Sequence, residues 1–347
     1  MTVIIAVLGL ILLIVIHEMG HMLTAKALGV RVTEFGIGFG PALFKKQFGK
    51  TIYSFRIILL GGFAKMAGMN DDATGPDTYT SKPAWRRALI IFAGPFANIL
   101  AAVVILAGIF MFSGQVTGVK NEVRAVEPGT LAAESGVKSG DKLVSVDGKE
   151  FSSWEGFKNA IGVKKPGDEV TVGLQRNGET KEISGALSAN PDQPKQALVG
   201  VQPVVEREYY GFFAAIGKAV SECVRFTGAI ATGVAQLVTG QLDFYDNVTG
   251  PVGIASVGGT AVQAGFFPLL LALISLNLAL MNLLPILPLD GGHLFFIAAE
   301  KVIGRPVSAE TMGKVAAFGL ALVLMLFVFA LYADVSKLVT GQSFLPQ

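Results

Sequence analysis

Apolar residues are gathered in a few long runs along this chain, and the charged residues lie between the runs. Four runs are long enough to cross a bilayer as helices, which takes about 20 predominantly apolar residues. They cover approximately Val3–Leu28, Leu89–Phe112, Phe266–Leu289 and Val315–Tyr332. The pattern predicts a polytopic α-helical membrane protein with about four transmembrane helices and a soluble insert between the second and the third.

The first run has the position of a signal peptide but lacks its other features. No lysine or arginine precedes Lys26, and no small-residue cleavage site follows the run. We therefore expect this segment to stay in the protein as its first membrane span.

Basic residues in the loops predict the orientation of the spans. The segment from Lys26 to Arg87 holds ten lysines and arginines against four acidic residues, and the short loop after the third run is also basic. Both loops should face the cytoplasm. The long insert after the second run should then lie outside, as should both termini.

The first loop contains an unusually apolar stretch from Val32 to Met66, where short strand-like runs are separated by glycines. We predict a β-hairpin over 32–66 that re-enters the membrane. Such a hairpin is tolerated where protein or a water-filled cavity covers its backbone. An amphipathic hairpin lying on the membrane surface is the alternative.

The insert 116–206 reads as a small α/β domain, because alternating strands are separated by Pro-Gly, Ser-Gly and Asp-Gly turns. Its GVKSGDKLVSVDG segment resembles the core of a PDZ domain, a class that binds extended peptides by strand addition. Residues 207–265 have the spacing of amphipathic helices that lie along the outer membrane surface. The two halves of a membrane core, 1–115 and 266–347, flank these segments.

Composition removes several classes of function. The chain is 52% hydrophobic and only 16% charged, and its net charge of +2 gives no reason to expect nucleic acid as a partner. One cysteine, Cys223, allows neither an internal disulfide nor a cysteine metal site. Any metal site must therefore use histidines and carboxylates.

Histidines 17 and 21 frame the sequence His17-Glu18-Met19-Gly20-His21, an HExxH motif. On a helix, positions i and i+4 share one face, so both imidazoles can reach one zinc ion. Glu18 then lies beside the metal, where it can accept a proton from an activated water. Only 14 apolar residues, Val3 to Ile16, precede the motif, so it lies within the span or at its inner edge, where ionisable residues are rarely incidental.

Two histidines need a third protein ligand. The candidates near the membrane are Asp290 and His293, both at the inner end of the third run. Chemistry favours Asp290, because a carboxylate at the end of an apolar run needs a cation nearby. The opposite arrangement, with His293 as ligand and Asp290 orienting it, stays open at this level.

Together these motifs resemble the site-2 protease family, in particular its bacterial regulator of sigma-E protease type. The resemblance rests on HExxH, on Asn282-Leu-Leu-Pro285-Ile-Leu-Pro-Leu-Asp290-Gly291, on Gly94-Pro95-Phe96-Ala97-Asn98 and on the PDZ-like insert. It implies an intramembrane zinc metalloprotease with one zinc ion per chain, in which His17, His21 and Asp290 bind the metal and Glu18 is the base.

The resemblance also implies how a substrate is held. Asn282 is expected to bind the substrate backbone, and the edge of the glycine-rich hairpin, at Gly61, Gly62 and Phe63, to pair with an unwound substrate. Substrates would be single-span proteins such as anti-sigma factors, or signal-peptide remnants, first cut by a site-1-type protease. The location would be the bacterial inner membrane, with the PDZ-like domain outside and the active site toward the cytoplasm.

One feature departs from the best-known enterobacterial members, which carry two tandem PDZ domains, whereas this insert has room for one. Asn98 and Asn282 each have a second interpretation, since an asparagine in a membrane helix often simply bonds a neighbouring helix. Two other functional classes remain to be separated from a protease: a zinc transporter and a catalytically silent scaffold.

Overall fold

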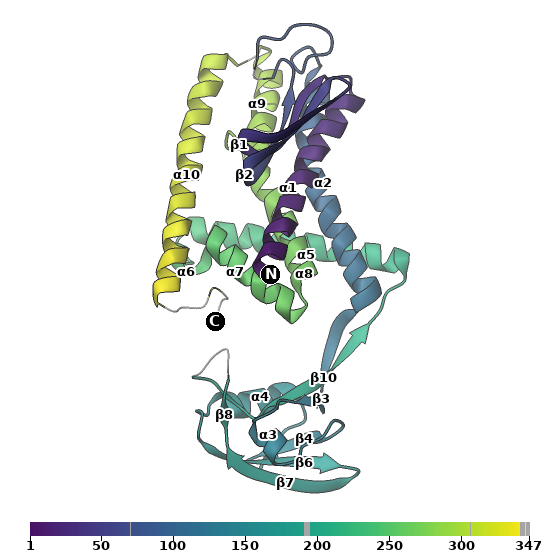
Figure 1. The fold of residues 1–347 in the computed structure, drawn as a ribbon, viewed down its shortest axis with the longest axis vertical. Helices are drawn as coiled ribbons and strands as arrows, with labels where there is room; N and C mark the ends of the chain where they lie inside the picture. Colours follow the sequence, from purple (N-terminus) through teal and green to yellow (C-terminus); the bar gives the residue numbers. More distant parts are fainter. Residues whose placement is uncertain (70, 191–194, 306, 341–343, 345–347) are drawn as a thin grey trace. The chain divides into compact units, whose positions relative to one another are not determined.

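A computed structural model describes residues 1–69, 71–190, 195–305, 307–340 and 344 (Figure 1). Its contacts divide the chain into two compact units. The first comprises Met1–Met111 together with Gly211–Gln347, and the second comprises Phe112–Tyr210. The insert predicted at 116–206 lies inside the second unit.

Helices dominate the first unit. They are α1 (Thr2–Ala27), α2 (Ala84–Gly108, continued by a π-helical turn at Ile109–Ser113), α5 (Phe212–Val238), α6 (Phe244–Asn247), α7 (Pro251–Ala264), α8 (Phe267–Asn282), α9 (Asp290–Ile303) and α10 (Ala309–Thr340). Within the described residues, three helices are long and apolar enough to cross a membrane: Thr2–Ala27, Ala84–Ser113 and Glu310–Thr340. They correspond to the first, second and fourth runs of the sequence.

The third run is not one continuous helix, and here the sequence prediction is wrong. α8 ends at Asn282, and α9 begins only at Asp290. Pro285 and Pro288 lie between them, and proline lacks the N–H that a helix interior needs. With 16 residues, α8 extends about 24 Å at 1.5 Å per residue, less than the roughly 30 Å of a bilayer's hydrocarbon core.

The break places Asp290 in the first turn of a helix. The N–H groups there have no partners within the helix, and the helix dipole favours a negative charge. Gly291 and Gly292 follow because a side chain at either position would collide with the backbone of the Leu283–Leu287 segment. The two glycines therefore let α9 begin directly against the loop that delivers Asp290.

α10 is tied to α7 by a buried carboxylate. The side chain of Asp334 accepts hydrogen bonds from the backbone N–H groups of Gly250 (3.0 Å) and Gly253 (2.8 Å) at the start of α7. Both N–H groups belong to the helix terminus and lack intrahelical acceptors. An aspartate buried in a membrane helix is thus explained here by a structural contact.

Two long strands, β1 (Val32–Phe48) and β2 (Thr51–Met66), occupy the predicted hairpin. Their register shows more than a simple hairpin, because residues 34–37 of β1 pair on one side with 62–65 and on the other with 52–55. Residues 42–48 pair with 51–56. Each strand is therefore folded back on itself, which gives four segments in the order 62–66, 32–37, 51–56 and 42–48. The two outer pairs are antiparallel, and the central pair, 32–37 with 51–56, runs parallel.

Glycines permit the two folds. Gly38 and Gly40 in β1 have φ angles of +87° and +79°, and Gly61 in β2 has a φ of +150°. Residues with a side chain rarely adopt such angles. The sequence pattern predicted one hairpin over 32–66. The turns at these three glycines fold each of its strands back, so that the hairpin becomes a sheet of four short segments.

One guanidinium links the segments of this sheet. Arg56 donates to the Glu34 carboxylate (2.6 Å) and to the Gly40 carbonyl (2.7 Å), and it lies over the Phe63 ring at 5.0 Å. These partners come from the segments 32–37 and 62–66 and from the turn inside β1. Arg56 thereby holds the segment 62–66, which runs along the sheet's outer edge, to the rest of the sheet.

The second unit is built on an antiparallel sheet in the order β10–β3–β4–β6–β7, with β5 paired to β4. The strands are β3 (Gln115–Val126), β4 (Lys142–Val146), β5 (Lys149–Glu150), β6 (Glu169–Arg176), β7 (Glu179–Ala186) and β10 (Val201–Glu208). A small pair, β8 (Ser188–Ala189) and β9 (Ala197–Leu198), and two helices, α3 (Leu131–Glu134) and α4 (Trp154–Gly162), complete it. In β6 the buried apolar residues Val170, Val172 and Leu174 alternate along the strand, as the sequence pattern predicts for a half-buried sheet.

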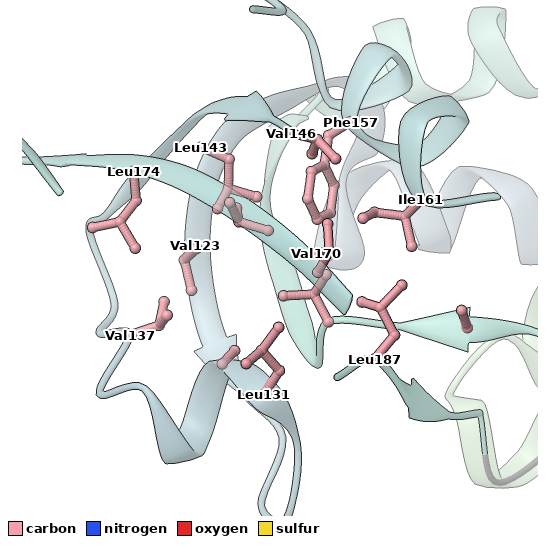
Figure 2. Close-up of a cluster of buried hydrophobic side chains, with 14 residues drawn as sticks. Val123, Leu131, Val137, Leu143, Val146, Phe157, Ile161, Val170, Leu174 and Leu187 are labelled. Atoms are coloured by element: carbon pink, nitrogen blue, oxygen red, sulfur yellow. The ribbon is translucent and has the colours of Figure 1, made fainter. Parts of the chain in front are cut away.

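Figure 2 shows the core of this unit, in which Phe157 and Ile161 of α4 pack over Val146 and Val170 of the sheet. At its margin, Arg176 donates to both oxygens of the buried Asp141 carboxylate, at 2.6 and 2.7 Å. The Arg176 guanidinium holds the pKa of Asp141 below its usual range, so this carboxylate stays charged at neutral pH.

Candidate metal centre

His17 and His21 lie one helical turn apart on the buried face of α1. Their side chains converge, and the two Nε2 atoms are 3.2 Å apart. Residues four apart lie on the same face of a helix, so the spacing of the HExxH motif lets both imidazoles point at the same place.

Asp290 brings a third donor atom to the same point from a segment more than 260 residues away in the sequence. Its Oδ2 lies 3.0 Å from His17 Nε2 and 3.3 Å from His21 Nε2. Within the described residues, this trio is the group of side chains whose geometry could hold a metal ion. The structure thus brings together all three residues that the sequence proposed as ligands.

The trio fits a zinc ion. Nitrogen and oxygen ligands at about 2.0–2.1 Å around a tetrahedral centre lie roughly 3.3 Å from one another. The observed separations are 3.0, 3.2 and 3.3 Å. Asp290 Oδ2 is also a buried atom with no hydrogen-bond partner among the described residues. A buried carboxylate oxygen without a partner is costly, and a bound cation would compensate it.

α2 packs closely against this part of α1. A side chain at Gly20 would collide with the backbone of Ala93, and a side chain at Gly94 would collide with both histidine rings. Two glycines on facing helices therefore let α2 reach the histidines directly. The Ile90 carbonyl accepts a hydrogen bond from His21 Nδ1 at 2.9 Å, and the Asn98 amide lies 3.3 Å from His17 Nδ1.

Glu18 lies between the histidines and the folded sheet. A methyl group placed on Gly62 would come within 3.0 Å of the Glu18 side chain and within 3.4 Å of Ile14. The segment 62–66 therefore passes beside Glu18, and the absence of a side chain at Gly62 makes the approach possible.

Comparison with known proteins shows which family the chain belongs to. The family model for peptidase family M50 matches residues 5–326. The chain belongs to peptidase family M50. It is therefore a metallopeptidase, and the family resemblance that the sequence motifs indicated is confirmed.

Relatives of this M50 peptidase extend over almost its whole length. A protein from Agrobacterium fabrum is 34% identical over 96% of this chain and 95% of its own length, and its name describes a zinc metalloprotease. Zinc metalloprotease RasP from Geobacillus kaustophilus is 29% identical over 94% of this chain and 95% of its own length. The names of these relatives support zinc as the metal.

Among solved structures, the PDZ domain of an SdrC-like protein from Listeria monocytogenes matches 26% of this chain and 90% of its own, with 25% identity and a TM-score of 0.22. A PDZ domain from Listeria innocua matches 26% of this chain and 99% of its own, with 26% identity and a TM-score of 0.23.

The residues predicted to bind substrate are placed differently from one another in this M50 member. Gly62 lies beside Glu18, whereas Phe63 points to the other face of the sheet and stacks on Phe39. Gly61 lies under the Phe39 ring, where a side chain would collide. Asn282 is the last residue of α8 and half-buried, outside the trio of candidate metal ligands.

His293, the alternative ligand, is not part of the trio. It lies one turn beyond Asp290 in α9 and lines a cavity of about 270 Å³. The same cavity is lined by Tyr79 and by the ion pair between Arg87 and Glu300, whose closest atoms are 2.7 Å apart. The geometry therefore favours Asp290 over His293 as the third donor.

Sequence reasoning missed the part that α2 plays. Ile90, Gly94 and Asn98 follow one another at intervals of four residues, so they lie on one face of the helix and meet the two histidines together. Only Gly94 and Asn98 carried a signal in the sequence, as part of the family motif. The role of the Ile90 carbonyl has no sequence signature, because every residue has one.

Proposed function

We propose that this metallopeptidase cleaves single-span membrane proteins, such as anti-sigma factors, or signal-peptide remnants, within the bilayer. His17, His21 and Asp290 would hold one zinc ion, and Glu18 would be the general base. The observation that carries the proposal is the buried trio of donor atoms, 3.0–3.3 Å apart, directly beside a glutamate on an apolar helix.

Zinc, when bound, supplies Lewis-acid activation of a carbonyl oxygen and of water. The residues of the chain supply the rest. Glu18 accepts a proton from the attacking water and later donates it to the leaving amine. The Ile90 carbonyl fixes the orientation of His21, and Asp290 contributes the negative charge that balances a cation in a buried place.

The folded sheet offers a way to present the substrate. A helix in a membrane satisfies its own backbone groups, so its peptide bonds are protected until it unwinds. Among the described residues, the segment 62–66 pairs on one side only, with 32–37. An extended substrate that pairs with its other side would lie close to Glu18, because a side chain at Gly62 would meet the Glu18 side chain. Asn282 would assist by bonding the substrate backbone.

We further propose four membrane crossings, with the broken α8–α9 segment as the third and the folded sheet re-entering from the cytoplasmic side of a bacterial inner membrane. The basic residues at 26–87 support this orientation. Cysteines introduced at Ser152 or Ser188 should then react with an impermeant reagent on intact cells, whereas one at Ala73 should not. If only the Ala73→Cys variant were labelled, the proposed orientation of the spans across the membrane would be wrong and the opposite one would hold.

One assay separates this proposal from its rivals. Detergent-purified protein should cleave a synthetic single-span peptide, and a zinc chelator should stop the cleavage until zinc is restored. A zinc transporter or a silent scaffold would leave the peptide intact under both conditions. In the cell, a site-1-type protease would make a first cut outside the membrane, so trimmed substrates should be cleaved faster than full-length ones.

A further inference from the structure

The face of α2 that meets the two histidines carries one side chain whose role the proposed function does not use. Asn98 is fully buried, and its amide lies 3.3 Å from Nδ1 of His17. Its backbone carbonyl accepts a hydrogen bond from Ser275 of α8 at 2.8 Å. Asn98 is therefore held on both sides, between α1 and α8, with its amide directed at a residue of the metal-binding trio.

His21 shows what such a contact does. Its Nδ1 lies 2.9 Å from the Ile90 carbonyl, which can only accept a hydrogen bond. The Nδ1 of His21 must therefore carry the proton. In a neutral imidazole, the lone pair is then on Nε2, the atom that faces Asp290 and His17.

His17 has the same requirement, since its Nε2 also faces the trio and must be free of a proton to bind a metal. The group next to its Nδ1 is the Asn98 amide. With the amide nitrogen toward His17, that nitrogen would donate to Nδ1. The ring proton would then be on Nε2, pointing at the other donor atoms.

Turning the amide by 180° exchanges its oxygen and nitrogen, two atoms that have almost the same shape. Oδ1 is at present a buried acceptor without a partner among the described residues. After the exchange it accepts the proton of His17 Nδ1. One amide atom stays unpaired in either orientation, so the requirement at His17 decides between them.

We propose that Asn98 is a positioning residue, which accepts the Nδ1 proton of His17 through Oδ1 and so presents the Nε2 lone pair to zinc. Asn98 and the Ile90 carbonyl would then form a matched pair of acceptors, one for each histidine, eight residues apart on one face of α2. The inference rests on the proposed zinc site and deepens it.

The test compares zinc affinity in three variants of the full-length protein, measured by competition with a chromogenic chelator. Asn98→Leu has a similar size but no acceptor and should weaken zinc binding by about 10–100-fold, as expected for loss of a group that orients a ligand. Asn98→Asp keeps an acceptor and should bind zinc at least as tightly as the unaltered protein. Ser275→Ala removes the hydrogen bond to the Asn98 backbone but leaves the Asn98 side chain in place, so it should weaken zinc binding less than Asn98→Leu does.

A second measurement does not depend on any variant. Nitrogen-15 NMR of the zinc-loaded, unaltered protein, with histidine and asparagine labelled, should show the Nδ1–H of His17 hydrogen-bonded to the side-chain oxygen of Asn98. An Asn98 side-chain NH2 group that faces His17 overturns the proposal even if Asn98→Leu fails to fold. Equal zinc affinity in Asn98→Leu and unaltered protein also overturns it, as does an equal loss in Asn98→Leu and Asn98→Asp, which would indicate packing alone. Failure of the unaltered protein to bind zinc would instead contradict the proposed function.

Discussion

Replacing Glu18 by glutamine should lower the rate of peptide cleavage by roughly three to four orders of magnitude while leaving the zinc content unchanged. Glutamine has nearly the shape of glutamate but cannot accept the proton of the attacking water. Glu18 is not one of the three converging donor atoms, so the metal site does not need its charge. Cleavage of a single-span peptide and zinc content would be measured on the same purified sample.

Met19→Leu is a matched control for this variant. Met19 is the next residue of the same helical turn, and its side chain is exposed. Its replacement should change neither activity nor metal content. Activity of Glu18→Gln within tenfold of the unaltered protein would rule out Glu18 as the base. Loss of zinc from Glu18→Gln would instead indicate that Glu18 helps to bind the metal.

The local part of the metal site could be predicted from the sequence. His17 and His21 meet because a helix returns to the same face after about four residues. The long apolar run around them predicted that helix, and α1 confirms it. The third ligand could not be predicted from local rules in this way. Chemical reasoning favoured Asp290 but kept His293 as an alternative third ligand, and the family resemblance was needed to choose between them.

Long-range geometry is what the sequence could not supply. The length of the third apolar run indicated one helix, but two prolines end α8 early and let Asp290 begin a new helix. Glycine punctuation in 32–66 indicated a hairpin, yet the fold-back of each strand depends on positive φ angles at Gly38, Gly40 and Gly61. In both cases the sequence contains the prolines or glycines that interrupt the regular structure. The path of the chain after them, however, depends on packing against distant segments.

The contacts of α2 make the same point at the level of single atoms. Gly94 and Asn98 could be recognised in the sequence as part of a motif. Only the close approach of α1 and α2 at Gly20 shows that they lie next to the two histidines. A backbone carbonyl such as that of Ile90 becomes part of a metal site only through this packing. Secondary structure and the first ligand pair follow from local rules, while the groups that orient the ligands follow from the tertiary fold.

The choice between Asp290 and His293 leads to the second large expected effect, on metal binding. Asp290→Ala should weaken zinc binding by more than about 100-fold, because it removes one of three donors, and loss of a merely orienting group already costs 10–100-fold. It also removes the negative charge that balances the cation in a buried site.

His293→Ala is the matched control, one turn further along α9, and should keep nearly the full zinc content, since His293 lines a separate cavity with Tyr79. Zinc would be measured by atomic emission on protein purified in detergent, with thermal unfolding to show that both variants are folded. Zinc retained by folded Asp290→Ala and lost by folded His293→Ala would reverse the assignment and make Asp290 the residue that orients the ligand.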